Sequence, residues 1–161
     1  MMMHMKIVIL SDSHGSKESL RYIRSSQEDA DLIIHCGDIC LPKEYTRGFI
    51  QVAGNCDDPS RYPLADLIEL EGHRIVITHG HAFFSGRNVN YDALSRFARR
   101  NQCDILCFGH SHLYCDVMHE GVRLLNPGSI SGNRDMTPPS YMIMHLSKDE
   151  VRIERKEYRP L

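Results

Sequence analysis

The sequence lacks a long apolar segment, an excess of basic charge and any C-x-x-C pair. A membrane-spanning helix needs about 18 consecutive apolar residues, and no run approaches that length. The formal net charge of -2 at pH 7 provides no general basic field to attract nucleic acid or an anionic membrane. We therefore expect no membrane partner and no long nucleic acid as a partner.

The six cysteines are not spaced as a metal or redox motif. Two pairs follow the spacing C-x-x-x-C, which is not a standard zinc or redox spacing. A metal or redox function based on the cysteines is therefore disfavoured, and we expect free, buried thiols at every position except Cys56. The N-terminus has neither a basic segment nor a small-residue cleavage site, so we expect a cytoplasmic protein in which residues 1–4 are an extension before Met5.

The length of 161 residues and the 42% hydrophobic content predict a single domain over residues 1–161. In the first half, short apolar runs alternate with amphipathic stretches, which predicts a β-α-β-α-β order and a parallel core. The expected strands are 5–11, 31–36 and 50–53, and the expected helices are 16–29 and 43–48.

The second half of the sequence predicts β-hairpins, where the first half predicts parallel strands connected by helices. Turn residues separate paired apolar runs, and the first turn is expected at Gly72-His73. The expected hairpins are 67–71 with 74–78, 113–118 with 122–125, and 140–146 with 151–155, and a helix at 91–101 and a strand at 104–108 lie between them. This mixed layout favours an α/β protein of two packed sheets with helices outside over a single doubly wound sheet.

Polar side chains that can bind metals follow five of the apolar runs. The five clusters are Asp12-Ser13-His14, Gly37-Asp38, Gly54-Asn55-Cys56-Asp57, Thr78-His79-Gly80-His81 and Gly109-His110-Ser111-His112. Each cluster alone is an ordinary turn or a hydrogen-bonding histidine, but active sites in α/β sheets gather outside the carboxyl ends of strands. The five together therefore predict one metal site at a shared edge.

The spacing of the donors indicates how such a site could be built. In extended backbone, residues i and i+2 point to the same side, so Asp12 and His14 could address one site together, as could His110 and His112. Asp38 follows its strand alone, and its two oxygens could bridge a pair of ions. These nitrogen and oxygen donors favour manganese, iron, nickel, cobalt or zinc over calcium.

Taken in order, the motifs SDSHG, GDI, GNCD, THGH, GHSH and NPGS resemble those of the calcineurin-like metallophosphoesterase superfamily, in its small single-domain phosphodiesterase branch of bacteria and archaea. The resemblance runs from about residue 5 to at least residue 146. It implies a four-layer α/β/β/α sandwich of two mixed β-sheets flanked by helices, with a dimetal centre at one edge.

The resemblance also implies a ligand set for two divalent ions per chain. The first ion would take Asp12, His14, Asp38 and His112, and the second would take Asp38, Asn55, His79 and His110. A water or hydroxide that bridges both ions would be the nucleophile on phosphorus, with Asp38 and Asn55 also counted as catalytic. We expect manganese first, with nickel, cobalt, iron and zinc left open.

Cys56 stands where many superfamily phosphatases have a histidine. A thiol is a weaker hydrogen-bond donor and not a cation, so a catalytic Cys56 predicts a preference for diesters over alkyl monoesters with poor leaving groups, and a simple packed thiol is the alternative. His81 could contact the substrate phosphate or donate a proton, or could serve only as a hydrogen-bonding partner. Asp57 is expected to orient Asn55 or a metal-bound histidine.

The segment after Asn126 has the composition of a turn, and the resemblance places it near the metal edge. Ser129 and Arg134 are therefore candidates for contact with an anionic substrate, since a guanidinium group suits phosphate. The resemblance further suggests a homo-oligomer, a dimer or larger, to which the stretch 81–89 with Phe83 and Phe84 could contribute unless these rings belong to the core.

Two functions are compatible with these observations. The first is a divalent-metal-dependent phosphodiesterase, a phosphoric ester hydrolase acting on small or nucleotide-like phosphate esters. The alternative is a non-catalytic protein scaffold of the same fold, similar to a subunit of the eukaryotic retromer in which the metal site is degraded. All seven ligand positions hold competent residues here, which favours the hydrolase.

Overall fold

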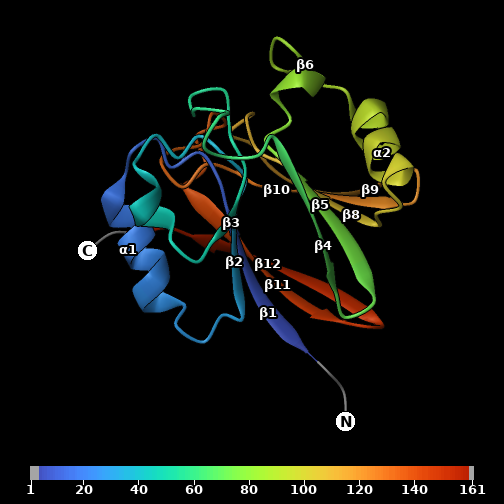
Figure 1. Cartoon of the computed structure of the whole chain (residues 1–161), viewed down its shortest axis with the longest axis horizontal. Coiled ribbons are helices and arrows are strands. Elements are labelled where there is room, and N and C mark those ends of the chain that lie inside the picture. Colours follow the sequence, from blue (N-terminus) through green and yellow to red (C-terminus); the bar gives the residue numbers. More distant parts are fainter. Residues whose placement is uncertain (1–3, 160–161) are drawn as a thin grey trace.

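The computed structural model describes residues 4–159, and it shows two five-stranded sheets packed face to face (Figure 1). The first sheet has the order β12-β11-β1-β2-β3 and consists of β1 (Met5–Leu10), β2 (Leu32–His35), β3 (Ile50–Gln51), β11 (Ser140–Ser147) and β12 (Glu150–Glu157). The second has the order β4-β5-β8-β10-β9 and consists of β4 (Ala65–Leu70), β5 (His73–Thr78), β8 (Ile105–Cys107), β9 (Tyr114–His119) and β10 (Val122–Pro127). Both sheets are mixed, because β1, β2 and β3 run parallel, as do β5, β8 and β10, while the remaining pairings are antiparallel.

The alternation of side chains along β1 divides the core into layers. Ile7 and Ile9 point into the space between the sheets, where they join Ile75 and Ile77 of β5 in one buried cluster. Their neighbours Val8 and Leu10 face the other way, onto α1 (Lys17–Ser26), whose buried face includes Leu20 and Ile23. The first sheet is thus apolar on both faces.

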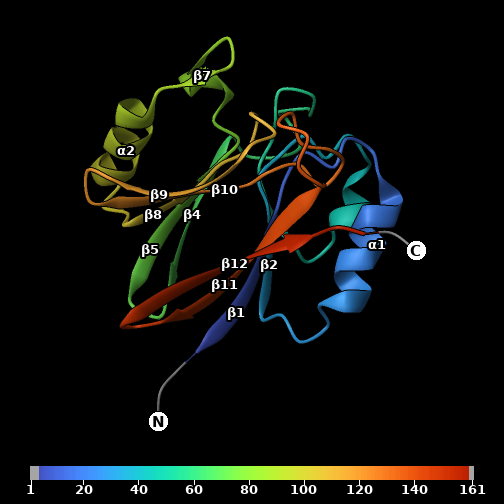
Figure 2. The same ribbon diagram turned by 180° about the vertical axis from the view of Figure 1, so that it is seen from behind.

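The second sheet repeats this arrangement with α2 (Tyr91–Arg100). Val76, Leu106 and Leu124 lie on its outer face and pack against Leu94 and Ala98 of the helix. The two helices therefore lie outside the two sheets, on opposite sides of the molecule, as the two opposite views show (Figures 1 and 2). This confirms the four-layer α/β/β/α sandwich expected from the sequence.

The helices end earlier than the sequence pattern predicts. In α1, Ser16 is the N-cap and its hydroxyl accepts a hydrogen bond from the Ser19 N–H, but the helix stops at Ser26 rather than at residue 29. The Gln27 side chain turns inward and donates to the Tyr141 hydroxyl. The expected helix at 43–48 is a single turn, η1 (Lys43–Thr46).

The first hairpin of the second sheet turns one residue earlier than expected. Leu70 pairs with His73, so the turn lies at Glu71-Gly72, where both residues have positive φ angles of 50° and 79°. Two left-handed residues match the twist of a two-residue hairpin, whereas His73 is needed in the strand. The turn between β9 and β10 lies at Glu120-Gly121, between the runs 113–118 and 122–125 that were expected to pair.

The segment after residue 80 contains structure that the sequence did not indicate. η2 (His81–Phe83) leads into a small hairpin of β6 (Phe84–Ser85) and β7 (Asn88–Val89). The Phe83 ring packs on Phe97 and the Phe84 ring lies near Phe108 and His110, so both rings are partly buried against the second sheet.

The cysteines differ in exposure more than the sequence predicts. All six cysteines are free, but Cys40 is exposed and Cys115 is half-buried, so the expectation of buried thiols is wrong at these two positions. Residues 1–3 of the expected N-terminal extension lie outside the described residues. Between residues 4 and 159, no helix has the length and apolarity that a membrane crossing requires.

Candidate metal centre

The five polar clusters meet where the carboxyl ends of the central strands lie together, at the upper edge in Figure 1. Asp12, His14, Asp38 and Asn55 come from the loops after β1, β2 and β3 of the first sheet. His79, His110 and His112 come from the loops after β5 and β8 of the second sheet. The site therefore spans both sheets.

One half of the site surrounds Asp12. The Nε2 atom of His112 lies 3.2 Å from Oδ1 of Asp12, and Nε2 of His14 lies 3.7 Å from the same oxygen. The two imidazole nitrogens are 3.2 Å apart. These donors all point at one small volume, as the ligands of an ion do.

The other half surrounds Asn55. Its Oδ1 atom lies 3.1 Å from Nε2 of His79 and 3.1 Å from Nδ1 of His110. The Nδ1–H of His79 donates to the Cys36 carbonyl at 2.8 Å, which directs Nε2 into the site. Nε2 is thus the ring nitrogen that could bind an ion.

Asp38 lies between the two halves. Its Oδ2 atom is 3.4 Å from Nε2 of His79 and 3.8 Å from Nε2 of His14. The structure therefore brings the seven predicted ligands together, with the carboxylate of Asp38 facing one imidazole from each half.

The donor set fits cations. Oδ1 of Asp12 is a fully buried carboxylate oxygen without a hydrogen-bond partner among the described residues, although three imidazole nitrogens lie within 3.8 Å of it. A buried unpaired carboxylate oxygen is costly, and a metal ion would satisfy it. Carboxylates, imidazoles and an amide oxygen are together suited to manganese, iron, cobalt, nickel or zinc.

The pKa shifts of the ligand residues also indicate a site for cations. Burial alone would raise the pKa of Asp12, but the adjacent imidazoles of His112 and His14 hold the pKa of that carboxyl well below its usual range. Burial lowers the pKa of His79, yet the adjacent carboxylates of Asp38 and Asp12 raise it overall. The carboxylates thus remain ionised and attract positive charge.

Five of the seven ligand residues have left-handed backbone, with positive φ angles at Asp12 (55°), His14 (45°), Asp38 (59°), His110 (73°) and His112 (57°). The side chains of Asp12 and His14 do lie close together, but the expected reason was wrong, because the members of both i, i+2 pairs have left-handed and not extended backbone. Non-glycine residues rarely adopt this conformation, which is concentrated at functional sites.

Asp57 supports the site differently from the expectation. Its carboxylate accepts hydrogen bonds from the backbone N–H groups of Asp38 at 2.7 Å, Cys40 at 2.9 Å and Gly54 at 2.9 Å, as well as from that of Ile39. Asp57 therefore fixes the two loops that carry Asp38 and Asn55 through their backbone, and its carboxylate has no hydrogen bond to an imidazole among residues 4–159.

Ser129 is also placed differently from the expectation. It is fully buried, and its hydroxyl donates to the backbone carbonyl of Asp12 at 2.9 Å, so it holds a ligand loop and is not accessible to substrate. Arg134 has an exposed side chain, and its backbone N–H donates to the His112 carbonyl at 3.0 Å.

His81 and Cys56 both lie beside the cluster. The His81 ring is 5.5 Å from that of His79 and 6.2 Å from that of His110, on the side expected from its spacing. Its Nδ1 atom is buried without a hydrogen-bond partner among the described residues. Cys56 is exposed, and its backbone N–H donates to Oδ1 of Asp38 at 2.9 Å.

Sequence reasoning missed two buried side chains that hold these loops. His35 accepts the Gly37 N–H at Nδ1 and donates from Nε2 to the Ser13 hydroxyl. Asn126 donates to the carbonyl of Gly109. In the sequence, each is marked only by being a polar residue at the end of an apolar strand, and that pattern is too common to indicate a role.

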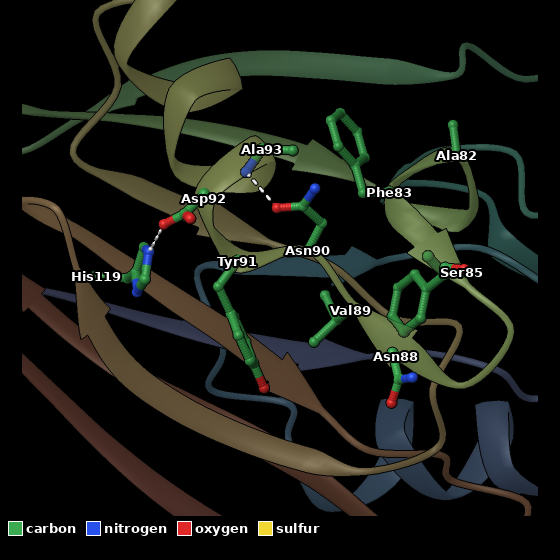
Figure 3. Close-up of a pocket in the computed structure, with 11 residues that line it drawn as sticks. Ala82, Phe83, Ser85, Asn88, Val89, Asn90, Tyr91, Asp92, Ala93 and His119 are labelled. Atoms are coloured by element: carbon green, nitrogen blue, oxygen red, sulfur yellow. Dashed lines mark hydrogen bonds and ion pairs between the residues drawn. The ribbon is translucent and has the colours of Figure 1, made fainter.

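A pocket lies next to the centre, between the β6–β7 hairpin, the start of α2 and β9. Figure 3 shows Phe83, Val89 and Tyr91 along this pocket, and Asn90 at the N-terminus of α2. Phe84 also lines the pocket, and its ring centroid lies 4.8 Å from that of His110. Phe84 therefore separates the pocket from the imidazole cluster.

A four-layer α/β/β/α sandwich with imidazoles and carboxylates at one edge defines the class of the metallophosphoesterases. Residues 5–149 match the family model of the calcineurin-like phosphoesterase superfamily domain, and the chain belongs to that superfamily. The chain is 33% identical over 154 residues to the probable metallophosphoesterase YsnB of Bacillus subtilis, which covers 92% of this chain and 89% of YsnB. It is 29% identical over 167 residues to the phosphodiesterase YfcE of Escherichia coli, with 85% of each chain covered.

Solved structures agree with this assignment of the fold. A predicted phosphoesterase from Streptococcus pneumoniae superposes with a TM-score of 0.87 at 27% identity, covering 99% of this chain and 95% of the other. Vps29 of Entamoeba histolytica, solved in complex with zinc, superposes with a TM-score of 0.73 at 21% identity, covering 94% and 98%. The family implies divalent metal ions, and the clustered donors are candidate ligands for them.

Proposed function

We propose that the protein is a divalent-metal-dependent phosphodiesterase that hydrolyses small or nucleotide-like phosphate esters. The observation that carries the proposal is the convergence of seven competent donors, Asp38 among them, with a buried carboxylate oxygen of Asp12 that has no hydrogen-bond partner among residues 4–159. The similarity to a phosphodiesterase of Escherichia coli supports the reaction class.

Each half of the cluster would hold one ion. Asp12, His14, Asp38 and His112 would hold the first, and Asp38, Asn55, His79 and His110 the second, with manganese expected before nickel, cobalt, iron or zinc. Bound ions of this kind act as Lewis acids that activate a water and neutralise charge developing on the phosphoryl oxygens.

The other side chains would set the substrate preference. The ring of His81 lies beside the imidazoles of His79 and His110, which suits contact with a substrate phosphate held there. Cys56 offers only a weak donor at the position next to Asn55, so we expect diesters to be preferred over alkyl monoesters. The exposed Arg134 is available for an anionic substrate.

Charge and thiol state support the cellular setting. The net charge of -2 suits a small anionic substrate held by ions better than a long nucleic acid held by a basic groove. Six free thiols are usual in a reducing compartment, and we propose a cytoplasmic enzyme. We also propose a homo-oligomer, which size-exclusion chromatography with light scattering would test.

The alternative is a protein scaffold of the same fold. The fold similarity to Vps29 gives this alternative its specific support. Complete ligand residues favour the hydrolase, since a scaffold does not need five of them in left-handed backbone.

The deciding experiment is hydrolysis of bis-p-nitrophenyl phosphate by chelator-stripped protein, with manganese, nickel, cobalt, zinc or magnesium added back. We expect a metal to restore diester cleavage in the wild type but not in Asp38→Asn, and a lower rate with the p-nitrophenyl monoester. A folded wild-type protein that is inactive with every metal would contradict the proposal and favour the scaffold.

A further inference from the structure

Two exposed thiols lie on the outer side of His14. Cys40 follows the Asp38 loop and Cys56 follows Asn55, sixteen residues further along the chain. The Sγ atom of Cys40 is 4.0 Å from Nδ1 of His14. One ligand atom from each of the three residues lies within 4.8 Å of the others. These three residues form the thiol cluster.

The thiol cluster is separate from the ligand set of the candidate centre, although the two share one side chain. His14 directs Nε2 toward Asp12, Asp38 and His112. Its other ring nitrogen, Nδ1, faces Cys40 on the opposite side of the ring. None of the proposed metal ligands of the phosphoesterase centre is Nδ1 of His14 or one of the two thiols.

The loops that carry the thiols are held by hydrogen bonds. The Cys40 N–H donates to Asp57 at 2.9 Å, and Cys40 has a left-handed φ of 57°. The Cys56 N–H donates to Asp38, also at 2.9 Å. Because both backbones are fixed, the two thiols are presented side by side at the surface.

The chemistry of the cluster suits a thiophilic cation. Two sulfur donors and one imidazole, with a water in the fourth position, form a common tetrahedral zinc environment. Tetrahedral bonds of about 2.0–2.3 Å place neighbouring donors roughly 3.5–3.8 Å apart, so closure needs side-chain movements of about 1 Å or less. The nearby carboxylates of Asp38 and Asp57 disfavour a bare thiolate and favour a cation.

We propose that Cys40, Cys56 and Nδ1 of His14 form a third metal site, which binds a soft divalent ion such as zinc or cadmium beside the phosphoesterase centre. Binding releases the two thiol protons to solvent. No sequence motif indicates such a site, because its cysteines are sixteen residues apart. They come together only because β2 and β3 pair and their loops therefore lie side by side.

An ion at the third site should weaken binding of the first ion of the phosphoesterase centre, because both ions would use His14. One imidazole binds two cations only after it loses its second proton, so the ions that use Nε2 and Nδ1 of His14 compete. Coupling of this kind is reciprocal. A soft ion at the thiol cluster would therefore inhibit the hydrolase, a consequence that rests on the proposed function.

The test is a titration of the reduced, manganese-loaded protein with cadmium, followed by the sulfur-to-cadmium charge-transfer absorption in the ultraviolet. Nitrogen and oxygen ligands do not give this band, so cadmium in the phosphoesterase centre is not detected. We expect a band that saturates at one cadmium per chain, and its loss in Cys40→Ser and in Cys56→Ser. Cys115→Ser, which removes a half-buried thiol on β9, is the matched control and should keep the band.

The outcomes separate clearly. A wild-type protein without the band, or a band that persists in both cysteine variants, overturns the proposal. If one variant fails to fold, the other still decides. In a second arm, we expect cadmium to inhibit wild-type diester cleavage by a larger factor than cleavage by Cys40→Ser. The absorption arm needs no hydrolysis, so an inactive wild type counts against the proposed function and not against the third site.

Discussion

Asp57 is a single residue on which two ligand loops depend. Its carboxylate accepts backbone N–H groups from both sides, including that of Asp38. In Asp57→Asn, one oxygen is replaced by an NH₂ group that faces these donors and cannot accept from them. We expect manganese affinity to fall about 10- to 100-fold and stability to fall by about 1–3 kcal/mol.

Calorimetric manganese titration and urea unfolding in the presence of a chelator would measure the two effects. Asp58→Asn is the control, since that exposed carboxylate contacts only Ser60 and Arg61 of its own turn among the described residues. Wild-type manganese affinity in Asp57→Asn would count against the role given to this residue.

Asn55 contributes to only one half of the centre, so a substitution there should affect one of the two proposed metal positions and leave the other intact. Its Oδ1 atom contacts His79 and His110 and no residue of the other half. We expect Asn55→Ala to retain about one ion per chain where the wild type retains two. Metal analysis of dialysed protein measures this, and an unchanged metal content with full activity would remove Asn55 from the ligand set.

His35 makes stability depend on pH. Burial lowers the pKa of its imidazole from 6.5 to about 4, so the folded state holds it neutral while the unfolded chain protonates it near pH 6.5. The stability that His35 contributes is present above pH 6.5 and is lost as pH falls toward 4. The loss reaches about 3 kcal/mol, since one pKa unit corresponds to about 1.4 kcal/mol.

The measurement is chemical unfolding of metal-free protein from pH 7.5 to pH 4, compared with His35→Gln, which does not titrate. We expect the difference between the two proteins to shift by that amount over this window. A difference that does not change with pH would show that His35 is not held neutral.

At the scale of single elements, the loop after β8 lies so close to the loop after β1 that position 109 has no room for a side chain. A Cβ atom at Gly109 would overlap the Ser11 hydroxyl and lie 2.7 Å from Oδ2 of Asp12. We expect Gly109→Ala to displace Asp12 and to reduce metal binding and activity by at least tenfold while the secondary structure is retained. Circular dichroism and metal analysis would measure this.

Gly121→Ala is the matched variant for that experiment. Gly121 lies in the β9–β10 turn with a φ of 80° and has open space around its Cα atom. It therefore adds backbone strain without a steric overlap, and it should lower stability by about 1 kcal/mol without loss of metal. Equal metal loss in both variants would mean that strain, and not contact with Asp12, disrupts the site.

The sequence predicted long elements better than short ones. Strands such as β1 and β5 are apolar on both faces and stand out as continuous runs, which is why the two-sheet sandwich was predictable. The hairpin of β6 and β7 has two residues per strand, and no periodicity exists over that length. Its position follows from tertiary contacts of Phe84 with Phe108.

For the site, residue types at strand ends predicted which donors converge, but not how. The left-handed backbone of Asp12 and His110 follows from loop packing, to which the sequence pattern is insensitive. The burial of Ser129 and the backbone role of Asp57 likewise depend on which loops lie side by side. The proximity of Cys40 and Cys56 has the same origin.

At the scale of the whole molecule, the candidate centre connects the two sheets. Asp12 and Asp38 come from one sheet and His79 and His112 from the other, so ions bound between them would hold the two sheets together at their shared edge. Manganese at about 100 times its dissociation constant would add about 2.7 kcal/mol of stability, which corresponds to a rise in Tm of roughly 5–10 °C for a chain of this size.

Differential scanning calorimetry with manganese and with chelator would measure this rise. Asp38→Asn should show less than half of the wild-type increase, because it removes the carboxylate that faces both halves. A Tm that is independent of manganese in the wild type would mean that the ions do not contribute to holding the sheets together.

The left-handed ligand residues have a consequence for the history of the fold. An aspartate or histidine in this backbone conformation costs about 1 kcal/mol or more relative to glycine, and five such positions lie in one edge. While hydrolysis is under selection, that strain is maintained. In a lineage where selection on hydrolysis is relaxed, replacing these residues with glycine or asparagine would stabilise the domain. Inactive descendants that keep the sandwich but lose the ligands are therefore favoured by thermodynamics as well as by drift.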